Sequence, residues 1–308
     1  MTDSDSKKLD VLGFGVVAVD DILLVASYPD VDTKTPVETE KRHCGGLAAT
    51  ALVAVSRLGG RAAFAGVLGE DNLSRFVLET LSGEGVDVRH VQKREGARPI
   101  HARIVLGKDR QSRNIFYNLA EFATMAAEDI DEEAVRSARV LFVDHVGIED
   151  KTRAAEIALE AGIPRVADFE GGDQPGFSTL LDLIDHPILP RHFAQEITGT
   201  TSAEKACQAL WTDRRSATVV TDGVEGCWYY DGQGDPAHLP AFHVDAVDTN
   251  GCGDVFHGAY AQTLAEGLEL EKRVRLASAA AALKATKSGY AGIPDRRTVD
   301  AFLHAREQ

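Results

Sequence analysis

The sequence predicts an α/β fold built on a largely parallel sheet. Short, almost continuous apolar segments such as residues 140–146 are typical of strands buried on both faces. Segments with helical spacing alternate with them, for example residues 151–161, which is the pattern of parallel βα units. Glycines and carboxylates follow several of these segments, and open α/β sheets bind ligands at that edge. The 308 residues suit one large α/β domain with an appendage, or two domains.

The composition excludes several classes of function. Asp and Glu outnumber Lys and Arg by 48 to 33, for a formal charge of −15, and no basic run occurs, which disfavours nucleic acid and anionic membranes as partners. No apolar run is long enough to span a bilayer and residues 1–10 are polar, so we expect a cytoplasmic protein. The cysteines form no Cys-x-x-Cys pair, which indicates neither a disulfide framework nor a zinc site: Cys44, Cys207, Cys227 and Cys252.

The first half of the chain opens with a nearly continuous apolar run over residues 11–19, which predicts a buried strand ending at Asp20 and Asp21. Asp20 at a strand end is placed to bind a ligand, whereas Asp21 is expected to be a solvated loop residue. Residues 37–43 form at best an edge strand. Gly45 and Gly46 then lead into a helix that stops at residues 59–60.

The remaining elements follow the same rules. Residues 62–68 predict a core strand and 72–83 a helix closed by glycine. Residues 100–106 and 114–117 flank a polar turn at 107–112, which predicts a hairpin. Strands are expected at 140–146, 165–169, 218–221 and 228–230, and helices at 151–161, 272–286 and 296–306.

The most informative stretch is Asp-Thr-Asn-Gly-Cys-Gly-Asp-Val-Phe-His-Gly at residues 248–258. Apolar residues recur at helical spacing from Val255, so Gly251 to Asp254 should form the entry into a helix. The first amides of a helix lack partners and attract anions, and glycines let a phosphate approach them closely. Asp254 could then accept a proton from a substrate hydroxyl, which predicts phosphoryl transfer. The alternative is an ordinary capping Asp.

Cys252 lies between the two glycines of this stretch, at the expected helix start. A thiol at a helix N-terminus can have a lowered pKa and react with electrophiles. The simpler interpretation is that Cys252 is a small residue in place of alanine, and we favour it.

The stretch from Asp248 to Asp254 resembles the C-terminal signature of the PfkB/ribokinase family of carbohydrate kinases. Gly45-Gly46 resembles the N-terminal signature, with Thr50 in place of the family's Asn. The resemblance covers residues 1–308 and implies a ribokinase-like three-layer α/β/α kinase domain with a mainly parallel central sheet. It also implies a small β-sheet lid from about residues 23–44 and 97–119, ATP and Mg²⁺ as cofactors, and a homodimer formed through the lid.

The family's site residues carry over position by position. The resemblance implies that Asp254 is the catalytic base and that Gly251, Cys252 and Gly253 form the anion hole. It implies sugar contacts from Asp20, Gly45, Gly46 and Thr50, and nucleotide contacts from Thr221, Gly223 and Gly226. Asp248 would help hold a monovalent cation such as K⁺, facing backbone carbonyls of residues 284–292, Gly289 among them. The family's Asn-x-x-Glu is missing from residues 189–199, where Glu196 is either a partial substitute or a solvated helix residue.

The substrate is less closely defined. In its motif details the chain most resembles the sulfofructose-kinase branch, and Lys34 and Asn118 fall near the places where that branch contacts its sulfonate. The arginine expected near Val146 is absent, so fructose or another hexose stays open. Two alternatives are a nucleoside kinase of the same fold, with Phe116 or Tyr117 stacking on the base, and a non-catalytic sugar- or nucleotide-binding regulator. No P-loop motif occurs.

Overall fold

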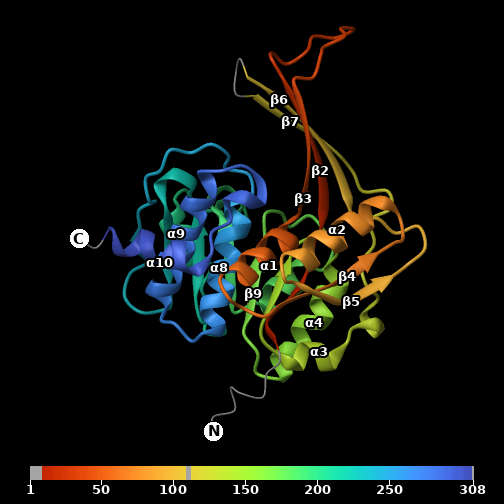
Figure 1. Cartoon of the computed structure of the whole chain (residues 1–308). Coiled ribbons are helices and arrows are strands. Elements are labelled where there is room, and N and C mark those ends of the chain that lie inside the picture. Colours follow the sequence, from red (N-terminus) through yellow and green to blue (C-terminus); the bar gives the residue numbers. More distant parts are fainter. Residues whose placement is uncertain (1–8, 109–111, 307–308) are drawn as a thin grey trace.

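The computed structural model describes residues 9–108 and 112–306 and contains two sheets (Figure 1). The central sheet has the strand order β13-β12-β11-β10-β9-β8-β1-β4-β5, and the small sheet has the order β3-β2-β6-β7. The strands of the central sheet are β1 (Leu9–Phe14), β4 (Ala62–Leu68), β5 (Asp87–Lys93), β8 (Ala138–Asp144), β9 (Arg165–Asp168), β10 (His186–Pro190), β11 (Thr218–Thr221), β12 (Cys227–Tyr230) and β13 (Ala237–Leu239).

The central sheet is parallel from β5 to β11, and only β12 and β13 are antiparallel additions at one edge. Parallel strands end at the same edge, and the register aligns several chemically active residues there. Asp144 at the end of β8 lies beside Asp168 at the end of β9, and Pro190 of β10 lies beside Thr221 of β11. The predicted α/β class with a mainly parallel sheet is therefore confirmed.

Helices cover both faces of this sheet. One layer consists of α1 (Leu47–Arg57), α2 (Asn72–Gly83), α8 (Cys252–Ala265), α9 (Leu270–Ala285) and α10 (Arg296–His304). The other consists of α3 (Glu132–Ser137), α4 (Ile148–Glu160), α5 (Phe177–Leu183), α6 (Arg191–Thr198) and α7 (Ala203–Leu210). Each layer buries its own apolar cluster against the sheet, which gives the three-layer α/β/α arrangement expected from the sequence. Short 3₁₀ turns are η2 (Ala127–Asp129), η3 (Gly223–Glu225) and η4 (Gly289–Gly292).

The small sheet projects from the main body as a lid (Figure 1). Its strands are β2 (Ala18–Val25), β3 (Thr39–Gly45), β6 (Ile100–Gly107) and β7 (Ser112–Asn118). Strand β2 pairs in parallel with β6, whereas the β2–β3 and β6–β7 pairs are antiparallel. The predicted hairpin corresponds to β6 and β7, and residues 109–111 of its turn lie outside the described residues.

The prediction of one strand over residues 11–19 is wrong. The apolar run is split between β1, which ends at Phe14, and β2, which starts at Ala18 in the lid. The break lies at Gly15, where an added Cβ atom would be 2.2 Å from Asp144 Oδ2, and the Val16 amide donates to the same oxygen at 2.5 Å. The chain therefore leaves the central sheet, and Asp20 lies inside a lid strand instead of just beyond a core strand.

Helices α1 and α8 approach each other closely at Gly258. A Cβ atom added there would lie 2.1 Å from the carbonyl oxygen of Ala51 on α1. No side chain fits in that gap, so the last glycine of the 248–258 stretch allows the two helices to pack backbone to backbone.

We predict that Gly258→Ala lowers the free energy of unfolding by about 1–3 kcal/mol, because the helices must separate to admit the methyl group. Gly83→Ala is the matched control, since Gly83 ends α2 and nothing lies within 4 Å of an added Cβ atom. Because alanine has a higher helix propensity than glycine, Gly83→Ala should leave the free energy of unfolding unchanged or raise it by up to about 1 kcal/mol. Urea denaturation measures both variants. Equal stability of the two would contradict the packing role of Gly258.

Candidate active site

The N-terminus of α8 is open to a ligand. Gly251 precedes the helix with a φ of 78°, a left-handed conformation that favours glycine. Gly253 is exposed, and a Cβ atom added to it would meet nothing within 4 Å. The first amides of a helix have no acceptor one turn back, and they carry the positive end of the helix dipole. This turn can therefore receive an anion, as the glycine pattern predicts.

Asp254 lies in the first turn of α8, and its pKa is raised well above the usual range. Burial is the main cause, followed by the nearby carboxylates of Asp168 and Glu170. His257 and a hydrogen bond with Thr50 oppose the rise. A carboxylate whose pKa is raised is a stronger base once it is ionised, which suits proton abstraction from a hydroxyl.

His257, which the sequence analysis missed, holds this turn in place. His257 Nδ1 lies 2.7 Å from the Gly253 carbonyl oxygen and 3.3 Å from Asp168 Oδ2, and Nε2 lies 3.1 Å from the Ile188 carbonyl oxygen. The buried imidazole thus joins the start of α8 to the ends of β9 and β10. In the sequence, only the position of His257 one helical turn after Asp254 indicated that it could lie near the site.

Asp168 is 1% exposed, and neither carboxylate oxygen accepts a hydrogen bond of good geometry. Burial raises its pKa well above the usual value, and Glu170 and Asp144 raise it further. A buried carboxyl without a hydrogen-bond partner is costly, and a positive charge brought to this acidic cluster would lower that cost.

The N-terminus of α1 meets the N-terminus of α8. Thr50 is buried in the first turn of α1, and its methyl carbon would lie 3.4 Å from a Cβ atom added to Gly251. A Cβ atom at Gly45 would lie 2.5 Å from Asp20 Oδ2, so this glycine makes room for the Asp20 carboxylate. Asp20, Gly45 and Thr50 are thus brought to the same side of the sheet as the α8 turn.

Gly46 has a φ of 99°, and an added Cβ atom would lie 2.5 Å from the Val16 carbonyl oxygen. The amides of Ala48 and Ala49 donate to that same oxygen at 3.2 and 3.4 Å. Gly46 and these first amides of α1 therefore hold the connection between β1 and the lid. The sugar contact that the family resemblance implied for Gly46 stays a prediction.

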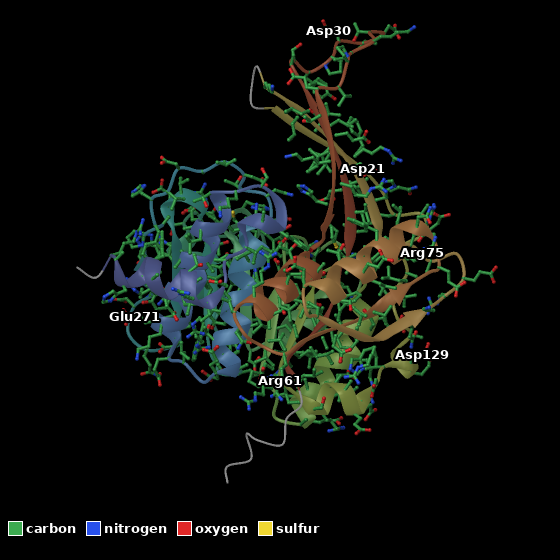
Figure 2. All side chains as sticks on the ribbon, in the orientation of Figure 1. Asp21, Asp30, Arg61, Arg75, Asp129 and Glu271 are labelled. Atoms are coloured by element: carbon green, nitrogen blue, oxygen red, sulfur yellow. The ribbon has the colours of Figure 1, made fainter. Side chains whose placement is uncertain are left out.

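Asp21 is not the solvated loop residue that the sequence suggested. Its carboxylate lies 2.6 Å from Arg42 Nε and 2.7 Å from His101 Nε2, and hydrogen bonds from Arg42 are the main reason that its pKa falls to about 2. Asp21, labelled on the lid in Figure 2, therefore links three lid strands. Asn118 ends β7 opposite His101, and its Oδ1 accepts the Ala120 amide.

Lys34 is exposed in the loop between β2 and β3, beyond the far end of the lid from Asp20. Asp20 is five residues before the end of β2, and a strand rises about 3.3 Å per residue, so this loop begins roughly 16 Å further along the lid. Within one chain, the structure does not bring Lys34 to Asp20 or Asp254.

Thr221 ends β11 at the ligand edge of the sheet. Gly223 follows with a φ of 55° and open space around it, as expected for a turn that approaches a ligand. Gly226 has another role, because a Cβ atom there would lie 2.0 Å from the Leu239 carbonyl oxygen. It is glycine because the chain packs closely against the end of β13.

Arg191 stands where the sequence lacks Asn-x-x-Glu. It is the first residue of α6, and its Nη1 lies 2.9 Å from Asp222 Oδ1 in the turn after β11. Glu196 is exposed further along the same helix. The cation beside the predicted nucleotide turn is therefore Arg191, which sequence analysis did not single out.

The remaining predicted positions can also be placed. Burial raises the pKa of the Cys252 thiol to about 11, which favours its interpretation as a small residue. Asp248 accepts hydrogen bonds from Lys284 and from the Gly289 amide.

Over residues 9–108 and 112–306, no three His, Cys, Asp or Glu side chains converge to hold a metal ion directly. No helix in these ranges is long and apolar enough to cross a membrane.

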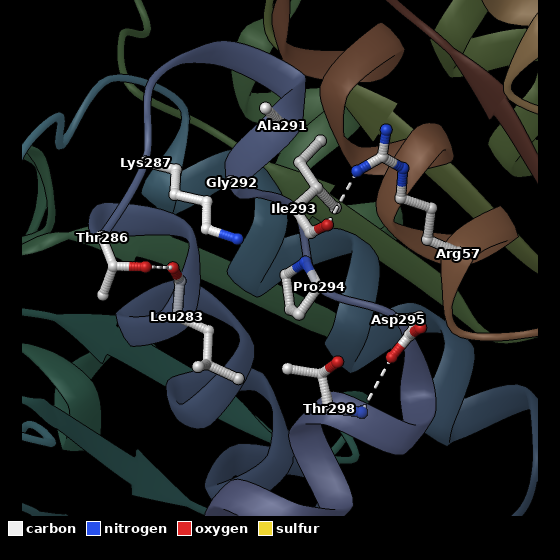
Figure 3. Close-up of a pocket in the computed structure, with 10 residues that line it drawn as sticks. All are labelled: Arg57, Leu283, Thr286, Lys287, Ala291, Gly292, Ile293, Pro294, Asp295 and Thr298. Atoms are coloured by element: carbon white, nitrogen blue, oxygen red, sulfur yellow. Dashed lines mark hydrogen bonds between the residues drawn. The ribbon is translucent and has the colours of Figure 1, made fainter.

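A separate pocket lies away from Asp254 (Figure 3). It is lined by Arg57 at the end of α1, by the end of α9 and by residues 291–298. Arg57 donates to the carbonyl oxygens of Tyr290 and Ile293 at 2.6 and 2.8 Å, which ties η4 to α1. Thr50, by contrast, lies at the opposite end of α1, beside the α8 turn.

Comparison with known proteins identifies the family. The family model described as pfkB family carbohydrate kinase matches residues 11–296. The chain belongs to this family. As a pfkB kinase it is an ATP-dependent sugar kinase, a phosphotransferase whose acceptor is an alcohol group.

Individual pfkB relatives resemble it over nearly the whole length. Fructokinase-1 of Zea mays is 30% identical, covering 91% of this chain and 92% of its own. Fructokinase-1 of Oryza sativa subsp. japonica is also 30% identical, with the same coverage of both chains. The solved structure of Arabidopsis thaliana ribokinase, complexed with ribose and ATP, is 25% identical with a TM-score of 0.84, and the match covers 96% of this chain and 98% of that one.

The Asp20 carboxyl predicts a pH-dependent stability. Burial, with the Asp21 charge as a second cause, raises its pKa to about 6 from 3.8. Between these values the folded chain holds more protons than the unfolded chain, so the stability that Asp20 contributes below pH 4 is lost as the pH rises through 6.

Asp20→Asn should therefore gain stability over the wild type across this window, reaching about 2–3 kcal/mol above pH 6. Urea denaturation from pH 4 to pH 8 measures the difference, with the exposed Asp245→Asn as the control. A difference that does not change with pH would contradict this account.

Proposed function

We propose that the chain transfers the γ-phosphoryl group of Mg-ATP to a hydroxyl of a ketohexose, with fructose as the first candidate. The observation that carries this proposal is the meeting of the α1 and α8 N-termini. It puts Thr50 against Gly251, beside the first turn of α8 that carries Asp254, with Asp20 packed against Gly45 just before α1. A base, an anion-binding turn and a hydroxyl acceptor are the parts that this reaction needs.

Each group has one task in this proposal. Asp20 accepts a hydrogen bond from a sugar hydroxyl and orients the ring, and the missing side chain at Gly45 leaves room for the Asp20 carboxylate. Asp254 takes the proton from the attacking hydroxyl, and the amides of residues 251–253 stabilise charge that develops on the phosphoryl oxygens. Thr221 and Gly223 line the nucleotide phosphates, with Arg191 beside them.

Mg²⁺ would enter with the nucleotide, because this ion keeps several waters and binds proteins through few carboxylates. The acidic cluster fits such a cation, since Asp168 is buried without a hydrogen-bond partner and raises the pKa of Asp254 together with Glu170. Bound there, Mg²⁺ would neutralise negative charge on the phosphates. Asp168 and Glu170 are the residues that would hold it.

A neutral ketohexose fits the site better than an anionic one. The relatives named above include two fructokinases and a ribokinase, and neither fructose nor ribose carries a charge. A sulfonate needs cationic donors, and Lys34 lies at the other end of the lid from Asp20. Lys34 could contact a sulfonate bound beside Asp20 only if it came from a second chain.

The lid carries exposed apolar side chains that a second copy could cover: Ile115, Phe116, Tyr117 and Leu119. Their position at the end of an open sheet supports a homodimer formed through the lid. Such a dimer would also remove the unpaired edges of β3 and β7 from solvent.

We predict that ADP release, measured with Mg-ATP over a panel of sugars, is fastest with one ketohexose. Asp254→Asn should lower kcat by about 10²–10⁴-fold, because the base is lost, and should leave ATP binding measured by calorimetry unchanged. The matched control is Asp245→Asn, an exposed residue of the preceding loop, which should keep wild-type kcat. Near wild-type turnover by Asp254→Asn would overturn the assignment.

Arg191→Ala tests the nucleotide side. Because Arg191 is the cation beside the turn after β11, its loss should raise the KM for ATP about tenfold and leave the KM for the sugar unchanged. Arg214→Ala removes an exposed arginine elsewhere on the surface and serves as the control. Equal effects on both substrates would argue against a nucleotide role for Arg191.

A further inference from the structure

The loop before the anion hole is held by a buried lysine. Lys284 lies near the end of α9 and its side chain is 2% exposed. Its Nζ donates to the Asp248 carbonyl oxygen at 3.0 Å and lies 3.2 Å from Asp248 Oδ2. A carbonyl oxygen and a carboxylate oxygen of one residue thus share a single positive charge.

Other donors complete the environment of Asp248. The Gly289 amide donates to Oδ2 at 3.1 Å and the Asn250 amide donates to Oδ1 at 3.0 Å. The Asp248 amide itself donates to the Ala285 carbonyl oxygen at 3.0 Å. Burial would raise the pKa of Asp248, but these amides and Lys284 outweigh burial and lower it. The residue has both its charge and its hydrogen-bonding groups satisfied by the protein.

The arrangement disagrees with the monovalent-cation site that the family resemblance implied for Asp248 and residues 284–292. An ion there would need the oxygens that already accept from Lys284. It would also stand within a few ångströms of an ammonium group in a largely buried place, where two like charges repel strongly. The residues present do not fit a bound K⁺ ion.

We infer that the Lys284 ammonium is a built-in replacement for the monovalent cation and orders the loop that leads to the anion hole. Its side chain reaches the place where it would act: a Cβ atom added to Gly251 would lie 3.9 Å from Lys284 Cε. Asp248 is three residues before Gly251, so fixing its carbonyl fixes the approach to the left-handed turn.

The other side of the same loop is also anchored. Arg57 donates to the carbonyl oxygen of Ile293 (Figure 3) and to that of Tyr290 in η4. It therefore fixes η4, whose first residue, Gly289, donates to Asp248. Lys287, in the pocket of that figure, is exposed, whereas Lys284 three residues earlier is buried against Asp248. The two lysines near the end of α9 thus provide a matched pair.

This inference rests on the proposed kinase function, and its first test needs no variant. Turnover of the wild type is measured in choline chloride and again after KCl or NH₄Cl replaces it at constant ionic strength. A tethered ammonium predicts a change within about twofold. Activation of several-fold by K⁺ would overturn it.

Lys284→Met removes the charge and keeps most of the side-chain volume. In choline chloride its kcat should fall about 100-fold, because the anion hole loses its alignment, and K⁺ or NH₄⁺ should restore at least about a tenth of wild-type kcat. Lys287→Met should match the wild type in every salt. Wild-type kcat of Lys284→Met without K⁺ would refute the inference.

Two readouts do not depend on activity. K⁺ should raise the Tm of Lys284→Met relative to choline and leave the wild-type Tm unchanged, because only an ion that binds the folded state stabilises it. Crystals of the wild type soaked with Tl⁺ should show no anomalous peak beside Asp248, and a peak there would overturn the inference.

If no sugar is phosphorylated, the kinase proposal fails while these readouts still decide the role of Lys284. If Lys284→Met does not fold, the wild-type measurements decide alone.

Discussion

The close packing of α1 against α8 is the constraint on which the candidate site depends. Gly258 allows the two helices to touch through their backbones at Ala51. Their N-terminal turns then lie side by side, although about two hundred residues separate them in the chain. Thr50 packs against Gly251 across this contact, and His257 joins the start of α8 to strand β10 of the sheet. A looser contact would separate the predicted base from the residues expected to hold the sugar.

The sequence was a good guide wherever local chemistry decides the structure. Gly251 marks a helix start because only glycine takes its backbone conformation easily, and Asp254 follows at a fixed place in the first turn. The helix at residues 72–83 is confirmed because its Asp71 cap and closing glycine are both local signals. The family signatures are strong for the same reason, since each is a run of neighbouring residues with one backbone geometry.

Contacts between distant residues explain what the sequence could not show. Gly13 and Gly15 interrupt the apolar run over residues 11–19, but the break at Gly15 is imposed by Asp144, far along the chain. Strand β5 is polar and lies at an edge, so its pattern does not stand out. Asp21 looks like a loop residue until Arg42 and His101 are placed beside it, and Lys284 looks like an ordinary lysine of an alanine-rich helix.

The path of β2 has a mechanical consequence. Asp20 lies two residues after the start of this strand, whereas the exposed loop that joins β2 to β3 lies beyond its far end. If the lid swings as a rigid unit about the short link after β1, at Gly15 and Val16, Asp20 lies close to the point of rotation and the tip lies far from it. Because displacement grows with distance from a pivot, a swing of the lid moves its tip several times farther than it moves the Asp20 carboxylate. In such a swing the loop between β2 and β3 would move most, while Asp20 would stay near the main body.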